Sequence, residues 1–177
     1  MAKNIEIKAK ARDWDAQLEA ARRRGDHEEI LEQKDVFFRC PESAGSESPA
    51  RLKLRRVNGR SELIAYHRPD HATAKTSDYE RCAVEDPEAL GRALTKALGA
   101  IGVVQKTRTL VMVGQTRIHF DEVEGLGRYL ELEVVLREGQ SEAEGQAIAD
   151  ELCEYLSITG DDLVEGAYLD HLTCSTK

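Results

Sequence analysis

The sequence predicts an α+β fold, in which a closed eight-stranded antiparallel β-barrel has helices packed on its outside. Three observations support this prediction. About eight strand-like segments are joined mostly by connections too short for parallel crossovers. Three or four helical segments carry apolar stripes that need an apolar partner surface. The opposite faces of the strands carry full charges, and about eight strands is a number at which a sheet closes on itself.

The N-terminal half contains five of the predicted strands and two of the predicted helices. Residues 4–11 alternate polar and apolar side chains, the period of a strand with one buried face. Asp13 is placed to cap a helix over 14–24, and Asp86 with Pro87 begins a helix that ends near Leu98. Turn and loop residues separate the remaining strands, which are expected at 32–39, 51–55, 61–68 and 76–84.

The C-terminal half contains three more predicted strands, at 103–113, 116–121 and 128–137. Ser141 and Glu144 form a capping box, which starts an amphipathic helix that ends near Leu156. Residues 161–172 are expected to form a short terminal helix.

Composition excludes several classes of protein. The chain has 177 residues, which fits one domain over 1–177 with a sizeable core. Its formal net charge is −8, and an acidic chain is a poor general binder of nucleic acid. No apolar run is long enough to span a membrane, and the first residues lack the apolar centre of a signal peptide. The four cysteines are far apart, so we expect reduced thiols and a cytoplasmic protein rather than disulfides or zinc.

The charged faces of the strands suggest a ligand. Cationic side chains dominate the third to sixth predicted strands, whereas carboxylates collect on the first, seventh and eighth. A flat sheet would leave these faces in solvent, whereas a closed barrel would turn them inward, and both arrangements fit the pattern. Arg and Lys neutralise phosphate oxygens, and carboxylates hold Mg²⁺ or Mn²⁺. The separation of the two signs therefore favours a polyphosphate bound together with a divalent metal.

Four motifs on these strands resemble a known family. Residues 4–8 read Asn-Ile-Glu-Ile-Lys, residues 106–108 Lys-Thr-Arg, residues 121–127 Asp-Glu-Val-Glu-Gly-Leu-Gly, and residues 131–133 Glu-Leu-Glu. They are similar to the Glu-x-Glu-x-Lys, Lys-x-Arg, Asp-x-x-x-Gly-Leu-Gly and Glu-x-Glu motifs of the CYTH superfamily, the triphosphate tunnel metalloenzymes. The resemblance covers about 4–172 and is greatest to the class IV adenylyl cyclase-like branch.

The resemblance implies an enzyme that binds a triphosphate and a divalent metal inside an eight-stranded tunnel. The expected reaction is the conversion of ATP to cAMP and pyrophosphate. Hydrolysis of an inorganic or organic triphosphate, such as thiamine triphosphate, is the alternative, as is a non-catalytic module that binds polyphosphate or nucleotide. The expected partner is the small-molecule triphosphate, without nucleic acid or membrane, and a homodimer is compatible with the sequence.

The resemblance also implies roles for individual residues. Glu6, Glu131 and Glu133 are expected to hold Mg²⁺ or Mn²⁺, and Lys8 and Asp121 are expected to be catalytic. The expected substrate-binding residues are Arg51, Lys53, Arg55, Arg68, Lys106, Arg108 and Arg117. His119 shares their strand face, where a packed neutral histidine and a ligand contact are equally compatible with the pattern.

Two positions depart from the family pattern. Asn4 stands where the family has its first Glu, so a second metal ion is expected to bind weakly. The fourth strand ends in Tyr-His-Arg-Pro over residues 66–69, where the family has Lys-Gly-Pro. Either His67 or Arg68 takes the place of that lysine. Arg68 is favoured because a guanidinium stays charged at neutral pH whereas most histidines do not.

Overall fold

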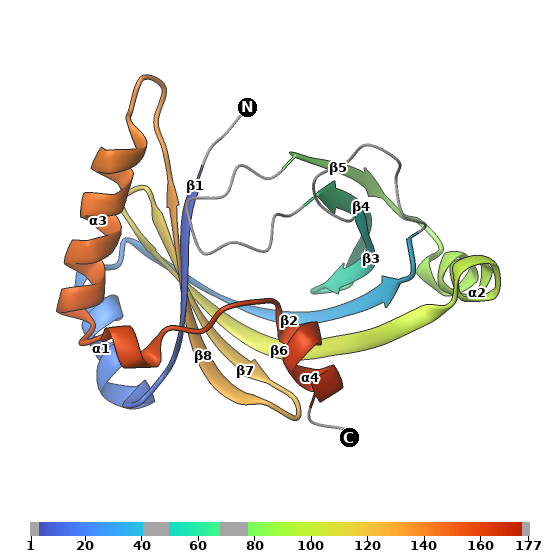
Figure 1. Ribbon diagram of the computed structural model, residues 1–177, viewed down its shortest axis with the longest axis horizontal. Helices are drawn as coiled ribbons and strands as arrows, with labels where there is room; N and C mark the ends of the chain where they lie inside the picture. The colour runs from blue at the N-terminus through green and yellow to red at the C-terminus, as the bar shows by residue number, and fades with distance from the viewer. Residues whose placement is uncertain (1–3, 41–49, 68–77, 175–177) are drawn as a thin grey trace.

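The protein is built on one antiparallel sheet of eight strands, as predicted (Figure 1). The structure is a computed structural model that describes residues 4–40, 50–67 and 78–174. Hydrogen bonds join the strands in the order β1-β8-β7-β6-β2-β3-β4-β5. The strands are β1 (Asn4–Lys10), β2 (His27–Phe38), β3 (Ala50–Val57), β4 (Arg60–His67), β5 (Asp78–Ala83), β6 (Ala100–Val113), β7 (Thr116–Val123) and β8 (Gly127–Val135).

The helices begin where the sequence predicts capping, except the terminal helix, which begins at Tyr168 rather than at residue 161. They are α1 (Trp14–Arg24), α2 (Pro87–Leu98), α3 (Glu142–Tyr155) and α4 (Tyr168–Cys174), with a short 3₁₀ turn, η1 (Gly160–Asp162). Asp13 and Asp86 accept hydrogen bonds from backbone N–H groups at the starts of α1 and α2, and Ser141 forms its capping box with Glu144. These side chains satisfy N–H groups that would otherwise lack partners at the start of a helix.

Two strands begin several residues earlier than predicted. β2 begins at His27 rather than Glu32, and β6 begins at Ala100 rather than Val103. Residues 27–30 are exposed and are held by backbone pairing with β6. A strand that buries neither face shows no alternation of polar and apolar residues, so the sequence pattern could not reveal it.

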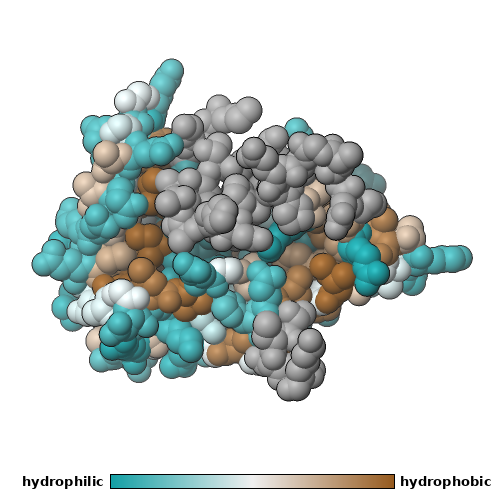
Figure 2. Space-filling view, in the orientation of Figure 1, coloured by the Kyte–Doolittle hydropathy of each residue, from teal (hydrophilic) through white to brown (hydrophobic). Residues whose placement is uncertain are grey.

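The helices α1 and α3 cover the convex face of the sheet, where α3 contacts β1 and β8 and α1 contacts β6. Apolar residues of both helices pack there against Ile118, Phe120 and Leu130, which are fully buried. Figure 2 shows hydrophilic residues on the outward side of these helices and hydrophobic residues along the seam where they meet the sheet. This packing leaves the charged faces of the strands to point toward the concave side.

The sheet is strongly curved, so the flat, solvated alternative is excluded. Figure 1 shows it bending along the long strands β2 and β6, with β3–β5 on one side and β1 and β8 on the other. Lys106 is only 5% exposed, and the side chain of Glu131 only 15%. Within the described residues, however, no hydrogen bonds join β1 to β5, so a barrel closed by backbone pairing is not confirmed.

The C-terminal segment occupies the free edge of β1. Val164 donates a backbone hydrogen bond to the carbonyl of Lys8 at 2.9 Å, and Ala9 and Leu163 form an isolated bridge. The segment then turns over the concave face, where Tyr168 and Leu169 of α4 pack against Phe37 and Val104. The prediction of helices on the outside is therefore wrong for α4, because its apolar side chains find a partner inside the curve of the sheet.

Among the described residues, no helix combines the length and the apolar character needed to cross a membrane.

Candidate active site

Strand register places the charged residues on one face of the sheet. Residues directly opposite each other in paired strands point to the same side. Three such pairs bring opposite charges together: Lys8 with Glu131, Asp121 with Arg108, and Asp35 with Arg55. This face is the concave one.

A cavity of about 220 Å³ lies within the concave face. Residues from seven strands and from the C-terminal segment surround it. Its charged lining residues are Glu6, Lys8, Asp35, Lys53, Arg55, Lys106, Arg108, Glu131 and Glu133. Eight of these nine are residues that the sequence predicts for the site, and Asp35 is the addition. The cavity also contacts Tyr66, His119 and Tyr168.

One side of the cavity carries a cluster built on Asp35. Its carboxylate accepts hydrogen bonds from Lys53 Nζ at 3.1 Å and from Arg55 Nε and Nη2 at 2.8 Å each. Asp35 is only 3% exposed. Burial would raise the pKa of this carboxyl, but the hydrogen bond from Arg55 and the charge of Lys53 outweigh burial and hold the pKa well below its usual value.

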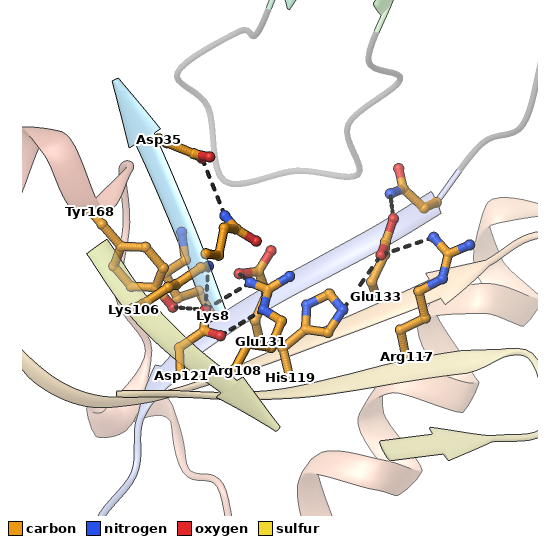
Figure 3. Close-up of polar contacts among 12 residues, drawn as sticks. Lys8, Asp35, Lys106, Arg108, Arg117, His119, Asp121, Glu131, Glu133 and Tyr168 are labelled. Atoms are coloured by element: carbon orange, nitrogen blue, oxygen red, sulfur yellow. Dashed lines mark hydrogen bonds and ion pairs between the residues drawn. The ribbon is translucent and has the colours of Figure 1, made fainter. Parts of the chain in front are cut away.

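The other side carries a matching cluster built on Asp121, which is fully buried (Figure 3). Its carboxylate accepts hydrogen bonds from Lys106 Nζ at 2.7 Å and from Arg108 Nε and Nη2 at 2.6 and 2.7 Å. Tyr168 OH donates to the same carboxylate at 3.0 Å. Burial alone would raise the pKa of Asp121, but Arg108 and Lys106 lower it to about 2. Each side of the cavity thus presents a Lys-x-Arg pair anchored by one aspartate.

The two lysines of these clusters are unusually easy to deprotonate. Burial lowers the pKa of both Lys53 and Lys106 to about 8, although the negative charges of Asp35 and Asp121 partly raise these pKa values again. Their Nζ atoms also lie near aromatic rings, with Lys106 Nζ 4.9 Å from the Tyr168 ring centroid and Lys53 Nζ 5.3 Å from that of Tyr66. The charge that the cavity offers to an anion therefore depends on pH.

We expect the affinity for tripolyphosphate to fall as the pH rises through about 8, because the anion needs the protonated lysines. Deprotonation of tripolyphosphate at higher pH only increases its negative charge, which would strengthen binding to cations. A loss of affinity must therefore come from a change in the protein. Isothermal titration calorimetry from pH 7 to 9.5 measures this. Lys106→Arg should remove roughly half of the pH dependence, because arginine keeps its charge throughout this range. Constant wild-type affinity across the range would contradict the prediction.

The carboxylates predicted to hold metal lie together at the β1–β8 end of the cavity. Glu6 is directly opposite Glu133, and Glu131 is opposite Lys8. Burial opposes ionisation of Glu131, but the charges of Lys8 and Arg108 outweigh it and keep its pKa well below the usual value. Glu131 is therefore available as an anionic oxygen donor, the type of ligand that Mg²⁺ and Mn²⁺ prefer.

These carboxylates do not yet form a closed set of ligands. Among the described residues, no three His, Cys, Asp or Glu side chains converge closely enough to hold a metal as they stand. Glu133 instead accepts a hydrogen bond from Arg117 Nη1 at 3.2 Å, and Arg108 Nη2 lies 3.4 Å from Glu131. The chemistry of the donors fits a divalent cation, and the geometry requires these side chains to rotate.

Asn4 has a specific contact in the place of the family's first Glu. Its Nδ2 donates to Glu133 Oε1 at 2.7 Å, so the amide orients a predicted metal ligand. Asn4→Glu would place two carboxylates in contact. We expect this variant to melt at a lower temperature than the wild type without metal, and to gain more stability from added Mg²⁺. Differential scanning fluorimetry over a Mg²⁺ series tests this, and equal Mg²⁺ responses would contradict it.

Two further predicted residues, Arg117 and Arg51, do not line the central cavity. Arg117 shares the concave face, but its side chain is 46% exposed. Arg51 has its Nη1 atom 3.8 Å from Asp170, near the C-terminal segment. Arg68 lies outside the described residues, as does the side chain of His67, so the choice between them stays a prediction.

Sequence reasoning missed Asp35 and Tyr168. The alternation Gln33-Asp35-Phe37 was a usable signal for Asp35, because it places the carboxylate on the same face as Arg55 once β2 and β3 are paired. No local signal was available for Tyr168. Its contact with Asp121 spans 47 residues and depends on the path of the C-terminal segment.

Comparisons with known proteins agree with the fold and the motifs. Residues 2–168 match the model of the CYTH domain family. A Methanocaldococcus jannaschii protein, provisionally named an adenylate cyclase, is 26% identical over 141 residues, which are 78% of this chain and 79% of that protein.

Solved structures with the same fold have lower sequence identity. A Pyrococcus horikoshii protein superposes with a TM-score of 0.79 at 22% identity, over 94% of this chain and 98% of its own. A Hippeastrum protein, provisionally named an adenylyl cyclase and described as having a dominant triphosphatase activity, gives a TM-score of 0.67 at 13% identity, over 100% and 97% of the chains.

Proposed function

This chain belongs to the CYTH domain family, whose members are adenylyl cyclase-like or triphosphate-hydrolysing enzymes, and we propose that it converts ATP to cAMP and pyrophosphate with Mg²⁺ or Mn²⁺. One observation carries the proposal. Two Lys-x-Arg pairs, Lys53 with Arg55 and Lys106 with Arg108, line one cavity, and Glu131 adjoins it from β8. Phosphoryl chemistry depends mainly on the positioning and neutralisation of charge, which such a cavity supplies.

The charge balance of the cavity supports a metal-bound substrate. Five cations face five carboxylates among the described residues at the site. The cations are Lys8, Lys53, Arg55, Lys106 and Arg108, and the carboxylates are Glu6, Asp35, Asp121, Glu131 and Glu133. A bare triphosphate would add several uncompensated negative charges to this balanced interior. A divalent cation bound with it would offset those charges, neutralising the phosphate oxygens and aligning them for attack.

A second cavity provides room for a nucleoside. It measures about 500 Å³ and shares Arg55 and Arg108 with the central cavity. Leu31 and Val57 give it an apolar wall. With the triphosphate in the central cavity, the sugar and base would extend into this second cavity. The ribose 3′-oxygen would then attack the α-phosphorus, the bond from that phosphorus to the bridging oxygen would break, and pyrophosphate would leave.

The proton of the 3′-hydroxyl needs an acceptor, and Asp121 and Lys8 are the proposed catalytic residues. Asp121 already accepts hydrogen bonds from Lys106, Arg108 and Tyr168, and its pKa of about 2 makes it a weak base. It would have to exchange the hydroxyl of Tyr168 for that of the substrate. Lys8 Nζ lies 4.5 Å from the centroid of the Tyr168 ring, so both proposed residues adjoin the same tyrosine.

Triphosphate hydrolysis is the second candidate. The central cavity of about 220 Å³ collects all five cations without contribution from the larger one, so a triphosphate without a nucleoside would meet the same charges. The Hippeastrum protein with this fold is described as having a dominant triphosphatase activity. Water would then attack the terminal phosphorus in place of the ribose oxygen.

Product analysis separates these reactions. The purified protein is incubated with ATP, thiamine triphosphate or tripolyphosphate, each with Mg²⁺, with Mn²⁺ or with chelator. Formation of cAMP and pyrophosphate from ATP supports cyclisation. Release of orthophosphate from any of the three, without cAMP, supports the triphosphatase. Absence of metal-dependent turnover with every substrate would overturn both and leave the binding module.

A further inference from the structure

His119 is buried in the central cavity, and no described residue forms a hydrogen bond with either of its ring nitrogens. Its side chain is 7% exposed, and Nδ1 has no partner. Nε2 lies 4.0 Å from Glu133 Oε2, which is too long for a hydrogen bond (Figure 3). Leaving Nδ1 buried and unpaired costs on the order of 1–3 kcal/mol, whereas Nε2 lies toward Glu133 and is the ring nitrogen available to a ligand.

The position of this ring is specific to the site. Two other buried side-chain polar atoms lack partners in the described part of the chain, Gln17 Oε1 and Thr116 Oγ1, and neither residue lines the cavity. His119 does line it, directly opposite Glu131 in the β7–β8 pairing. An unpartnered imidazole therefore lies between the two carboxylates of the Glu-x-Glu strand.

We propose that His119 is a ligand of the divalent cation, together with Glu131 and Glu133. This inference rests on the proposed metal role of those two carboxylates. Nε2 lies 4.0 Å from Glu133 Oε2, so a small rotation of either side chain would bring both atoms within reach of one cation. Arg117, the present partner of Glu133, is 46% exposed and can move to solvent at little cost.

A ring nitrogen changes which metal the site prefers. Mg²⁺ favours oxygen ligands and keeps several water molecules, whereas transition-metal ions accept imidazole more readily. The site should consequently bind Mn²⁺ more tightly than Mg²⁺, and His119 should be the residue responsible. Without the histidine, the carboxylates of Glu131 and Glu133 alone would leave a weaker preference for Mn²⁺.

Electron paramagnetic resonance with Mn²⁺ tests the proposal directly. Mn²⁺ is added to the full chain, alone and with tripolyphosphate, and electron spin-echo modulation is used to detect a directly bound ¹⁴N. The wild type should show ¹⁴N coupling, and His119→Gln should lose it together with about tenfold in Mn²⁺ affinity. Mg²⁺ affinity, measured by competition, should change less than threefold. His27→Gln, at an exposed histidine of β2, is the matched control and should keep the coupling.

The outcomes separate this inference from the proposed function. The wild type could bind Mn²⁺ without ¹⁴N coupling, while Glu131→Gln fails to bind Mn²⁺. This result would overturn the role of His119 but leave the carboxylate site intact. That result would mean that a water molecule satisfies the ring. If the wild type binds no Mn²⁺ under either condition, both the histidine ligand and the metal part of the proposed function are overturned. A second variant, His119→Asn, also removes the imidazole ring. If both variants lose the coupling but keep the melting temperature of the wild type, the loss is due to the missing ring and not to a folding defect.

Discussion

Glu131→Gln is expected to reduce metal-dependent turnover by at least about 100-fold, because it removes a proposed metal carboxylate whose side chain is only 15% exposed. Glu131 faces Lys8 across β1 and lies 3.4 Å from Arg108, so its negative charge serves both the cation site and the balance of the cavity. The amide keeps the size of the side chain but loses the charge that attracts a divalent ion. Turnover measured against Mg²⁺ and Mn²⁺ concentration gives the loss and any change in metal requirement.

Glu133→Gln distinguishes loss of metal from loss of fold. Its side chain is 21% exposed, and a glutamine oxygen can still accept one of the two hydrogen bonds that Asn4 and Arg117 donate to separate oxygens of Glu133. We expect it to fold normally and to lose activity as Glu131→Gln does. Glu122→Gln is the matched control, since Glu122 lies on the opposite face of β7, exposed and paired with Arg128. If both site variants kept full activity and the same metal requirement, the metal assignment would be wrong.

Asp121→Asn should cause the largest loss of stability of any conservative substitution proposed for this site. Asp121 is the shared partner of Lys106 and Arg108, both deeply buried. Removing one member of a buried ion pair leaves an uncompensated charge and costs about 3–5 kcal/mol. For a chain of this length, that corresponds to a fall of roughly 10 °C in melting temperature.

A polyphosphate should partly rescue this variant. Tripolyphosphate would supply negative charge near Lys106 and Arg108, so it should raise the melting temperature of Asp121→Asn more than that of the wild type. Scanning calorimetry with and without the ligand measures both effects. A variant that melts within about 2 °C of the wild type would contradict the role of Asp121 as the anchor of the two cations.

The loss of stability at acidic pH provides an independent measure of the interaction of Asp121 with Lys106 and Arg108. The pKa of Asp121 is about 2 in the folded protein and lies near 3.8 without its partners. Its contribution is therefore complete above about pH 4 and is lost as the pH falls toward 2. Asp121→Asn should lack this part of the acid transition, which urea unfolding at pH 2–5 would show. An identical slope in wild type and variant would place the effect elsewhere.

Much of the candidate site could be predicted because strands repeat with a period of two. Arg51 to Arg55 and Lys106 to Arg108 alternate charged and uncharged residues, and a local repeat of this kind assigns each side chain to a face without knowledge of its neighbours. Helix starts at Asp13, Asp86 and Ser141 were predictable for the same reason, since a cap acts within three residues of the chain.

Predictions failed where a residue acts through a partner distant in the sequence. The first residues of β2 have no buried face, and only pairing with β6 makes them a strand. Asp35 becomes an anchor because β3 brings Arg55 beside it, across 20 residues. Tyr168 reaches Asp121 because the C-terminal segment pairs along β1 and then turns over the concave face.

The amino-acid sequence by itself thus determined the eight antiparallel strands, the charged faces of β1, β3, β6, β7 and β8 and the cationic and acidic motifs, because these features depend on neighbouring residues. The tertiary structure decided the curvature of the sheet, the position of α4 inside the curve and the pairing of each Lys-x-Arg pair with one aspartate. It also decided that His119 lies unpartnered between the proposed metal carboxylates. These features depend on which surfaces meet when the chain folds, since burial and the partners it provides are properties of the whole packed molecule.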